Sequence, residues 1–128
     1  MRRSTRHYLV AVAAVSGGLW LRRGRPVGRV EVVGDSMLPA LAPGDRLLVL
    51  RTRRGREKVG DVVALTDPRL PARTLVKRVA ARGAEAVTVL GDNPAASTDS
   101  RLLGPVAREA IRGRAVYRYF PESRRGRV

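Results

Sequence analysis

The chain has 128 residues, of which 44% are hydrophobic and 4% aromatic, enough for one folded domain with a core of Val, Leu and Ala. It has no cysteine, which excludes disulfides, a thiol nucleophile and cysteine-bound zinc, and its single histidine, His7, lies in a basic N-terminal run, which excludes a histidine-based catalytic triad. The net charge of +15 fits a well-solvated, arginine-rich surface, with attraction to nucleic acid or anionic lipid as the alternative.

Residues 1–26 are predicted to form a basic tail and a short apolar segment. Residues 8–21 are uncharged, and arginines lie on both sides. A helix of this length rises about 21 Å, which is short of a hydrocarbon core of roughly 30 Å, although flanking arginines and Trp20 extend its reach. A short membrane anchor, a surface-lying or core-docking helix and a cleaved signal peptide are the three interpretations, and the side of the membrane stays open. Without a spanning segment the protein is expected in the cytoplasm.

From residue 27 onward the pattern changes to short runs of β-branched and apolar residues that alternate with polar ones. Such runs, separated by Pro-Gly and Asp-Pro turns, are typical of an all-β barrel or sandwich. We therefore expect a mainly β fold with a compact domain at residues 27–121 and a basic tail at 122–128. The predicted strands are residues 29–33, 46–50, 61–65, 74–79, 86–90 and 115–120, with turns at 42–45 and 67–71 and loops at 51–58 and 91–104.

Lysine is rare in this chain, since Lys58 and Lys77 are the only lysines among 26 Lys and Arg residues. Lys58 lies in a charged loop, whereas Lys77 lies in a predicted strand. Arginine stays protonated in proteins, but a desolvated lysine can lose its proton and act as a general base. For that, the pKa of Lys77 must fall from about 10.4 to near 7–8. Leu75 and Val79 lie on the same strand face as Lys77, so an apolar wall is available, and Arg78 faces the other side. A strand lysine with its head in solvent is the alternative.

A nucleophile for such a base is Ser36, in the run Gly34-Asp35-Ser36-Met37-Leu38-Pro39. Gly34 permits a tight bend that exposes the hydroxyl, and Pro39 stiffens the return of the chain. The alternative interpretation is that Ser36 is an ordinary turn residue.

A third candidate element is the loop at residues 91–101. It is rich in turn formers and is, in the simpler interpretation, only a loop. Its short polar side chains also allow a charged network, such as Asp99 with Arg101, that places a hydroxyl near a buried amine.

Together these segments resemble the ordered motifs of the type I signal peptidase family. The matching runs are Ser36 to Pro39, Gly44 to Val49, Lys77 to Val79, and residues 91–101 with 104–106, in the same order over residues 29 to 121. The resemblance implies a signal-peptidase-like β core and a serine endopeptidase without metal or other cofactor. Its partner would be a precursor protein with an N-terminal leader.

The resemblance also implies roles for individual residues. Ser36 is similar to the family nucleophile, and its backbone amide to part of the oxyanion hole. Lys77 is similar to the general base and Ser97 to the hydroxyl that orients the lysine amine. Asp99 and Arg101 correspond to a structural ion pair beside the site.

Two further positions follow from the resemblance. Met37 would pack against the dyad and shape the substrate cleft. Some members carry a serine two residues before the nucleophile as a second oxyanion donor, where this chain has Gly34. A backbone amide must then serve, or the second donor is missing.

The chain also departs from larger family members. The run after Val79 lacks their Gly-x-Pro-Gly pattern, and the short distance from Lys77 to Gly91 leaves no space for a large second β-domain. This compactness resembles the small actinobacterial branch, including proteases that mature nickel-type superoxide dismutase, and less closely the mitochondrial inner-membrane and archaeal-type minimal members. The preferred specific substrate is therefore the nickel-type superoxide dismutase leader, followed by general secretory leaders.

Two alternatives change the function. Self-cleaving repressors of the LexA type share Gly-Asp-Ser-Met-x-Pro and a downstream lysine, but they lack the 91–101 loop. The other alternative is a basic nucleic-acid-binding module in which Ser36 and Lys77 are incidental. In the preferred interpretation, as a peptidase, no specific nucleic acid is expected as a partner.

Overall fold

The computed structural model describes residues 25–51 and 56–128, with side chains described from residue 28 onward in the first range. Eight strands form one antiparallel sheet, in the order β1-β2-β7-β3-β4-β5-β6, and β8 pairs with β7. The expected mainly β fold is confirmed, and the sheet is open rather than closed into a barrel. The strands are β1 (Arg25–Glu31), β2 (Arg46–Arg51), β3 (Val62–Asp67), β4 (Leu70–Arg82), β5 (Ala86–Leu90), β6 (Val106–Ala107), β7 (Ile111–Phe120) and β8 (Gly126–Arg127). Short helical turns are η1 (Pro94–Ala96), α3 (Ser100–Leu103), η2 (Arg108–Ala110) and η3 (Glu122–Arg124).

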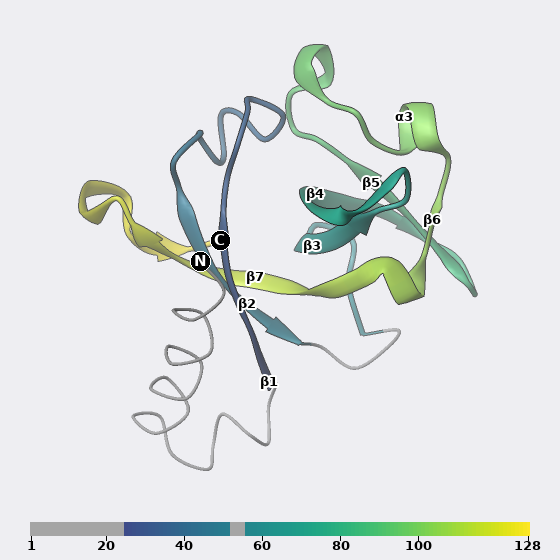
Figure 1. Cartoon of the computed structure of the whole chain (residues 1–128), viewed down its shortest axis with the longest axis horizontal. Helices are drawn as coiled ribbons and strands as arrows, with labels where there is room; N and C mark the ends of the chain where they lie inside the picture. The colour runs from purple at the N-terminus through teal and green to yellow at the C-terminus, as the bar shows by residue number, and fades with distance from the viewer. Residues whose placement is uncertain (1–24, 52–55) are drawn as a thin grey trace.

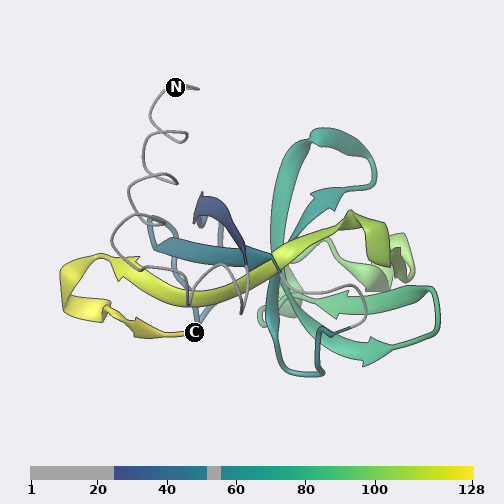
Figure 2. The ribbon, with the colours of Figure 1, turned by 90° about the horizontal axis from the view of Figure 1, so that it is seen from below.

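Strand β7 joins the two halves of the sheet. It pairs with β2 through one stretch and with β3 through another. Figures 1 and 2 show it running from the half that holds β1, β2 and β8 into the half that holds β3 to β6. The nucleophile candidate and the base candidate come from different halves, so β7 fixes the frame between them.

Each half has its own apolar core, and β3 separates the two. Because side chains alternate along a strand, β3 places one set of residues in each core, and four consecutive residues of it are buried. Core A consists of Val32, Met37, Leu41, Leu47, Val49, Val62, Ala64 and Ala115. Core B consists of Val63, Leu65, Val79, Val87, Val89 and Val106.

Strand β4 is longer than the sequence predicts. The expected turn over residues 67–71 is confined to its first part, because Leu70 already belongs to β4. There the buried Asp67 accepts the backbone N–H of Arg69 at 2.9 Å and so forms the tight turn that connects β3 to β4. The prediction was wrong about Leu70-Pro71 because proline is tolerated in a strand whose edge is not paired.

The predictions for the two chain ends have different outcomes. The predicted apolar helix at residues 8–21 lies outside the described residues, and in the described ranges no helix is long and apolar enough to cross a bilayer. At the other end, part of the predicted basic tail adds to the sheet, where Arg127 and Gly126 of β8 pair with Tyr117 and Arg118 of β7.

Candidate active site

Lys77 lies in the middle of β4, opposite Val63 of β3, and only 3% of its surface is exposed. Its strand neighbours divide as the alternation predicts. Leu75 and Val79 pack in or against core B, whereas Val76 packs against core A. Arg78 does not simply point into solvent as expected, since its guanidinium holds Asp92 in a two-pronged ion pair at 2.8 and 2.9 Å. Lys77 thus lies on the buried face of β4, between Leu75 and Val79.

A chain of hydrogen bonds fixes that amine. The Lys77 Nζ donates to Ser97 Oγ at 3.1 Å, and Ser97 Oγ donates to Asp99 Oδ2 at 2.6 Å. Because the hydroxyl proton of Ser97 is committed to Asp99, its oxygen can only accept from Lys77. The predicted orienting hydroxyl thus lies beside the predicted base.

Asp99 is a fully buried carboxylate that is saturated with donors. Its Oδ2 accepts from Gly91 N, Ser97 Oγ and Arg101 Nη2, and its Oδ1 accepts from the backbone N–H and the Nε of Arg101. Burial by itself would raise the pKa of Asp99, but the hydrogen bonds from Arg101, Ser97 and the backbone outweigh it and hold the pKa well below its usual value. Asp99 is therefore a permanent anion, and its predicted pairing with Arg101 is present.

The electrostatic setting of Lys77 favours the neutral amine. Burial is the main cause that lowers the pKa of Lys77, and the charge of Asp99 works in the opposite direction. The positive charges of Arg101, Arg73 and Arg69 lower the pKa further. A lysine with a lowered pKa that is held in one orientation becomes neutral, and so able to accept a proton, at a lower pH than an ordinary lysine.

Ser36 lies in the turn between β1 and β2, and this turn contacts the loop that carries Ser97. The Asn93 N–H donates to the Ser36 carbonyl oxygen at 2.8 Å, and the Asn93 side chain donates to the carbonyl oxygen of Asp35 at 3.1 Å. Ser36 is half-buried. In the described residues, the hydrogen bond of the Lys77 amine goes to Ser97 and not to the Ser36 hydroxyl.

Gly91 is the contact between the two parts of the site, and sequence reasoning did not single it out. A Cβ at this position would lie 2.7 Å from the Ser36 carbonyl oxygen and 2.2 Å from Ser97 Oγ. Its own N–H donates to Asp99, and its carbonyl accepts from Arg101. Only a residue without a side chain lets the Ser36 turn approach the Lys77 network this closely.

The other predicted residues around Ser36 have structural positions. Gly34 has a φ of 80°, a left-handed conformation in which a serine would be strained, so this backbone itself favours glycine. Met37 is fully buried in core A, where it anchors the turn, and its contact with the dyad stays a prediction. Pro39 is exposed in the same turn.

A buried ion cluster of Asp45, Arg118 and Arg124 supports the turn that follows Ser36, and no motif in the sequence points to it. Asp45 accepts from the backbone N–H of Ala42, from Arg118 Nη1 at 3.1 Å and from Arg124 Nη2 at 2.7 Å. The same Arg118 nitrogen donates to the carbonyl of Ala40. The turn after Ser36 is therefore tied to β7 and to η3.

Over the ranges that are described, no three His, Cys, Asp or Glu side chains gather as a metal ion requires. The connected groups are the Lys77 amine, the Ser97 hydroxyl and the buried Asp99 carboxylate, and the backbone of Ser36 lies against the same loop through Gly91 and Asn93. This set is suited to proton transfer at a serine.

Comparison with known proteins gives one family and several relatives. Residues 2–89 and 83–120 match the model of the family described as signal peptidase, peptidase S26. The chain is 37% identical to the mitochondrial ATP-independent inner membrane protease subunit 1a of Arabidopsis thaliana, over 74% of this chain and 71% of the relative. It is 31% identical to subunit 1b of the same plant, over 69% and 67% of the two chains. It is 34% identical to the mitochondrial inner membrane protease subunit 2 of Schizosaccharomyces pombe, over 80% and 68%.

Proposed function

Because the chain belongs to the signal peptidase family, peptidase S26, we propose that it is a serine endopeptidase in which Ser36 is the nucleophile and Lys77 the general base. Its catalytic domain is residues 27–121, and its substrate is a precursor protein from which it removes an N-terminal leader or signal peptide. The observation that supports the proposal is the buried amine of Lys77, which donates to Ser97, together with the close approach of Gly91 to both Ser97 and the Ser36 carbonyl oxygen.

The proposed reaction has two halves. In the first, Ser36 Oγ attacks the scissile carbonyl carbon while the neutral Lys77 amine accepts the hydroxyl proton. The resulting ammonium gives this proton to the leaving amine as the C–N bond breaks, and an acyl-enzyme remains. In the second, Lys77 takes a proton from water, the hydroxide attacks the ester, and Ser36 is released with its proton restored.

The backbone N–H of Ser36 is the proposed donor to the developing oxyanion, and one such donor contributes about 3–4 kcal/mol in other hydrolases. Gly34 cannot add a side-chain donor, so a second donor must be a backbone N–H of the same turn. The tight turn around Ser36, held by Met37 in core A, supports this role.

The substrate and location are proposed more broadly. The named relatives are inner membrane proteases, which supports association with a membrane through residues 1–26. A leader of nickel-type superoxide dismutase is the specific substrate that we propose to test first. The family match favours leader removal over a self-cleaving repressor or a nucleic-acid-binding module.

The decisive experiment is co-expression of candidate precursors with the wild-type chain or with the Ser36→Ala variant, followed by N-terminal sequencing of the products. We expect a new N-terminus only with the wild type. Cleavage of equal extent with Ser36→Ala would reject the proposed nucleophile. Absence of cleavage for secretory and superoxide dismutase precursors alike would reject the proposed substrates.

A further inference from the structure

The first half of β4 has a free edge. Strand β3 pairs with β4 as far as Leu70, but β5 pairs with it only from Arg78 to Arg82. In the described sheet, the edge of residues 70–76 that faces away from β3 therefore has no partner strand. Such an edge presents backbone N–H and C=O groups to which an extended peptide can bind.

This edge leads directly to the candidate active site. The free edge ends at Lys77. The pairing of β5 with β4 stops at Leu90 and Arg78, so the next residue, Gly91, lies beside the end of the free edge, and Gly91 contacts Ser36. A peptide extended along residues 70–76 would thus bring a backbone carbonyl to Ser36 while its neighbouring residues pass over the β3–β4 hairpin.

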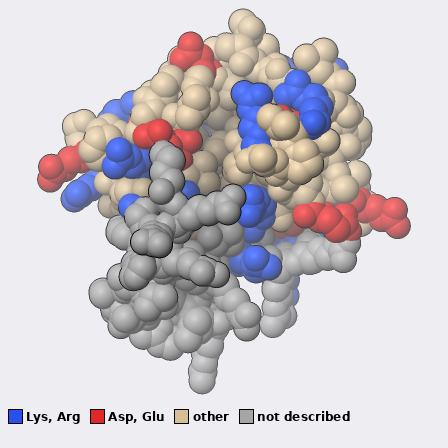
Figure 3. All heavy atoms as spheres, in the orientation of Figure 1, with Lys and Arg blue, Asp and Glu red and all other residues tan. Residues whose placement is uncertain are grey.

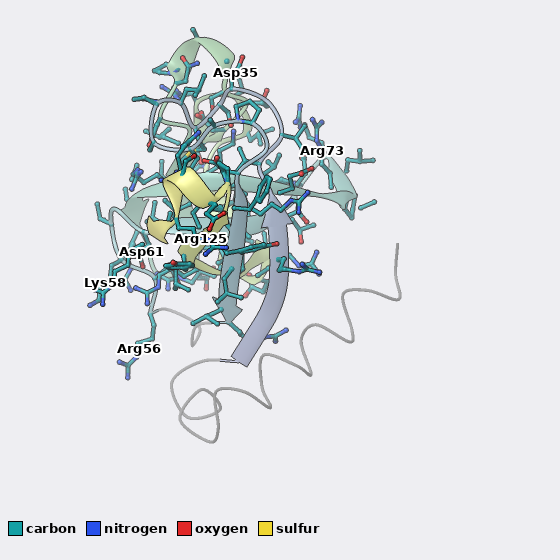
Figure 4. The ribbon with its side chains drawn as sticks, turned by 90° about the vertical axis from the view of Figure 1, so that its left-hand side faces the viewer. Asp35, Arg56, Lys58, Asp61, Arg73 and Arg125 are labelled. Atoms are coloured by element: carbon teal, nitrogen blue, oxygen red, sulfur yellow. The ribbon has the colours of Figure 1, made fainter. Side chains whose placement is uncertain are left out.

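The surface beside the free edge is positively charged. Arg69 and Arg73 lie at the hairpin, and their charges, with that of Arg101, all reach Lys77. Figure 3 shows Lys and Arg side chains gathered over the part of the molecule that holds this hairpin. In Figure 4, Arg73 lies at the same end of the molecule as Asp35, the residue before Ser36.

Arg73 differs from Arg69 and Arg101 because its guanidinium is not paired with any described aspartate and can bind a charged group of a substrate. Arg69 is held by Asp67 through two hydrogen bonds at 3.1 and 3.2 Å, and Arg101 is held by Asp99. Arg73 is exposed and forms no hydrogen bond or ion pair with a described residue. It lies in the stretch between Leu70 and Thr74 where the register with β3 shifts, so no residue of β3 opposes it.

We propose that Arg73 is a specificity-determining residue that selects precursors with a carboxylate near the scissile bond. Arg73 precedes Lys77 by four residues, a span of at most about 13 Å along a strand. The acidic side chain therefore lies within about four positions of the scissile bond, on one side of it. This inference rests on the proposed peptidase function, and it names the chemical class of substrate that the free edge accepts.

The test uses the full chain and quenched fluorescent peptides that span the cleavage site of an accepted precursor. A set of peptides places Glu, Gln or Lys at each of the four positions on either side of the scissile bond. We expect one position at which Glu gives a kcat/KM roughly five- to ten-fold above Lys at low salt, with the ratio shrinking at high salt. Arg73→Glu should reverse the order at that position.

The matched control is Arg127→Glu, which makes the same charge change on exposed β8 at the other end of the molecule and should leave the Glu preference intact. A preference that survives Arg73→Glu, or the lack of any charge preference in peptides that are cleaved, would overturn the inference while leaving the peptidase proposal standing. Failure to cleave any peptide with any form would instead count against the peptidase proposal. Binding of anionic vesicles that Arg73→Glu abolishes, with peptide preference unchanged, would show a membrane contact and also overturn the inference.

Discussion

In the proposed mechanism, Lys77 occupies a position at which an arginine could not act as the base. Its buried amine accepts a proton only if it first becomes neutral, and a guanidinium does not lose its proton in a protein. In a chain so rich in arginine, a lysine at this strand position fits the proposed requirement.

We therefore expect Lys77→Arg to lower kcat/KM by roughly 10²- to 10⁴-fold, the usual contribution of a general base. The measurement is peptide cleavage by the purified variant, with circular dichroism to verify the fold. Lys58→Arg is the matched control, because Lys58 is exposed in a loop and should tolerate the change. Substantial activity in Lys77→Arg would eliminate lysine as the base.

The same amine predicts how activity depends on pH. Burial lowers the pKa of Lys77 below 10.5, so the protonated, inactive form is lost as the pH rises through this lowered value. Activity should increase toward alkaline pH, and it should do so at a lower pH than the titration of an ordinary lysine would require. The measurement is kcat/KM between pH 6 and 9, and a flat profile over this range would contradict the assignment.

The proposed role of Ser97 is to position the base rather than to react itself. Ser97→Ala leaves Lys77 buried but removes the acceptor that fixes its amine. We expect a smaller loss than for Lys77→Arg, about ten- to a hundred-fold in kcat, because orientation is lost while the base remains. Threonine at the same position should restore part of the rate, since its hydroxyl can reach the same partners. An unchanged rate in Ser97→Ala would remove the proposed role.

At the scale of secondary-structure elements, the site depends on how closely the turn after β1 approaches the loop after β5. Gly91→Ala tests this approach. The new Cβ would overlap the Ser36 carbonyl oxygen and Ser97, so the backbone of the nucleophile must move. Because misplacement by about 1 Å can cost a hundred-fold in rate, we expect kcat to fall by at least that order.

Gly83→Ala is the matched control for this prediction. It makes the same chemical change in the β4–β5 connection, where a Cβ would meet only one backbone oxygen at 3.2 Å. Its activity should stay close to that of the wild type. Equal activities for the two alanine variants would show that the two loops do not need to touch.

The elements themselves were predictable to the extent that their burial alternates. Strands β2 and β5 begin where the sequence pattern places them, because one face of each packs in a core and the other does not. The full length of β4 was missed, since its first residues, from Leu70 to Arg73, are exposed and lack alternation. The four-residue helix α3 was missed because it is too short for a helical period, although Asp99 caps it.

The residues of the candidate site also differ in whether a local sequence pattern predicts them. Ser36, Lys77, Ser97 and the Asp99–Arg101 pair each have a local motif that can be recognised along the chain. Gly91 could not be found by its conformation, because its φ is not left-handed and its requirement is for space between two segments distant in sequence. Such requirements arise only when the chain is folded.

At the scale of the whole molecule, the last residues of the chain stabilise the loop that carries the proposed nucleophile. Arg118 on β7 connects three segments, since it donates to the side chain of Asp45, to the carbonyl of Ala40 and to the carbonyl of Arg124. Asp45 is only 1% exposed, so the arginines supply hydrogen-bond partners that its side chain cannot find in water. The C-terminal segment is thus tied to the turn that follows Ser36, although it lies outside the proposed catalytic domain.

Arg118→Ala tests this long-range support. The change leaves a buried carboxylate with Arg124 as its remaining ionic partner and removes the donor to the Ser36 loop, so the free energy of unfolding should fall by about 2–4 kcal/mol. We also expect kcat to fall more than KM rises, because the loop is less firmly placed while the free edge of β4 is intact. Chemical denaturation and steady-state kinetics measure the two effects. Arg125→Ala is the control, since Arg125 is exposed and its side chain pairs, within the described ranges, with the carbonyl of Tyr119 and with Glu122 at the surface. If stability falls in Arg118→Ala while kcat is unchanged, then the ion cluster stabilises the fold without positioning the proposed nucleophile, and the contacts with Gly91 and Asn93 and the burial of Met37 suffice to hold Ser36.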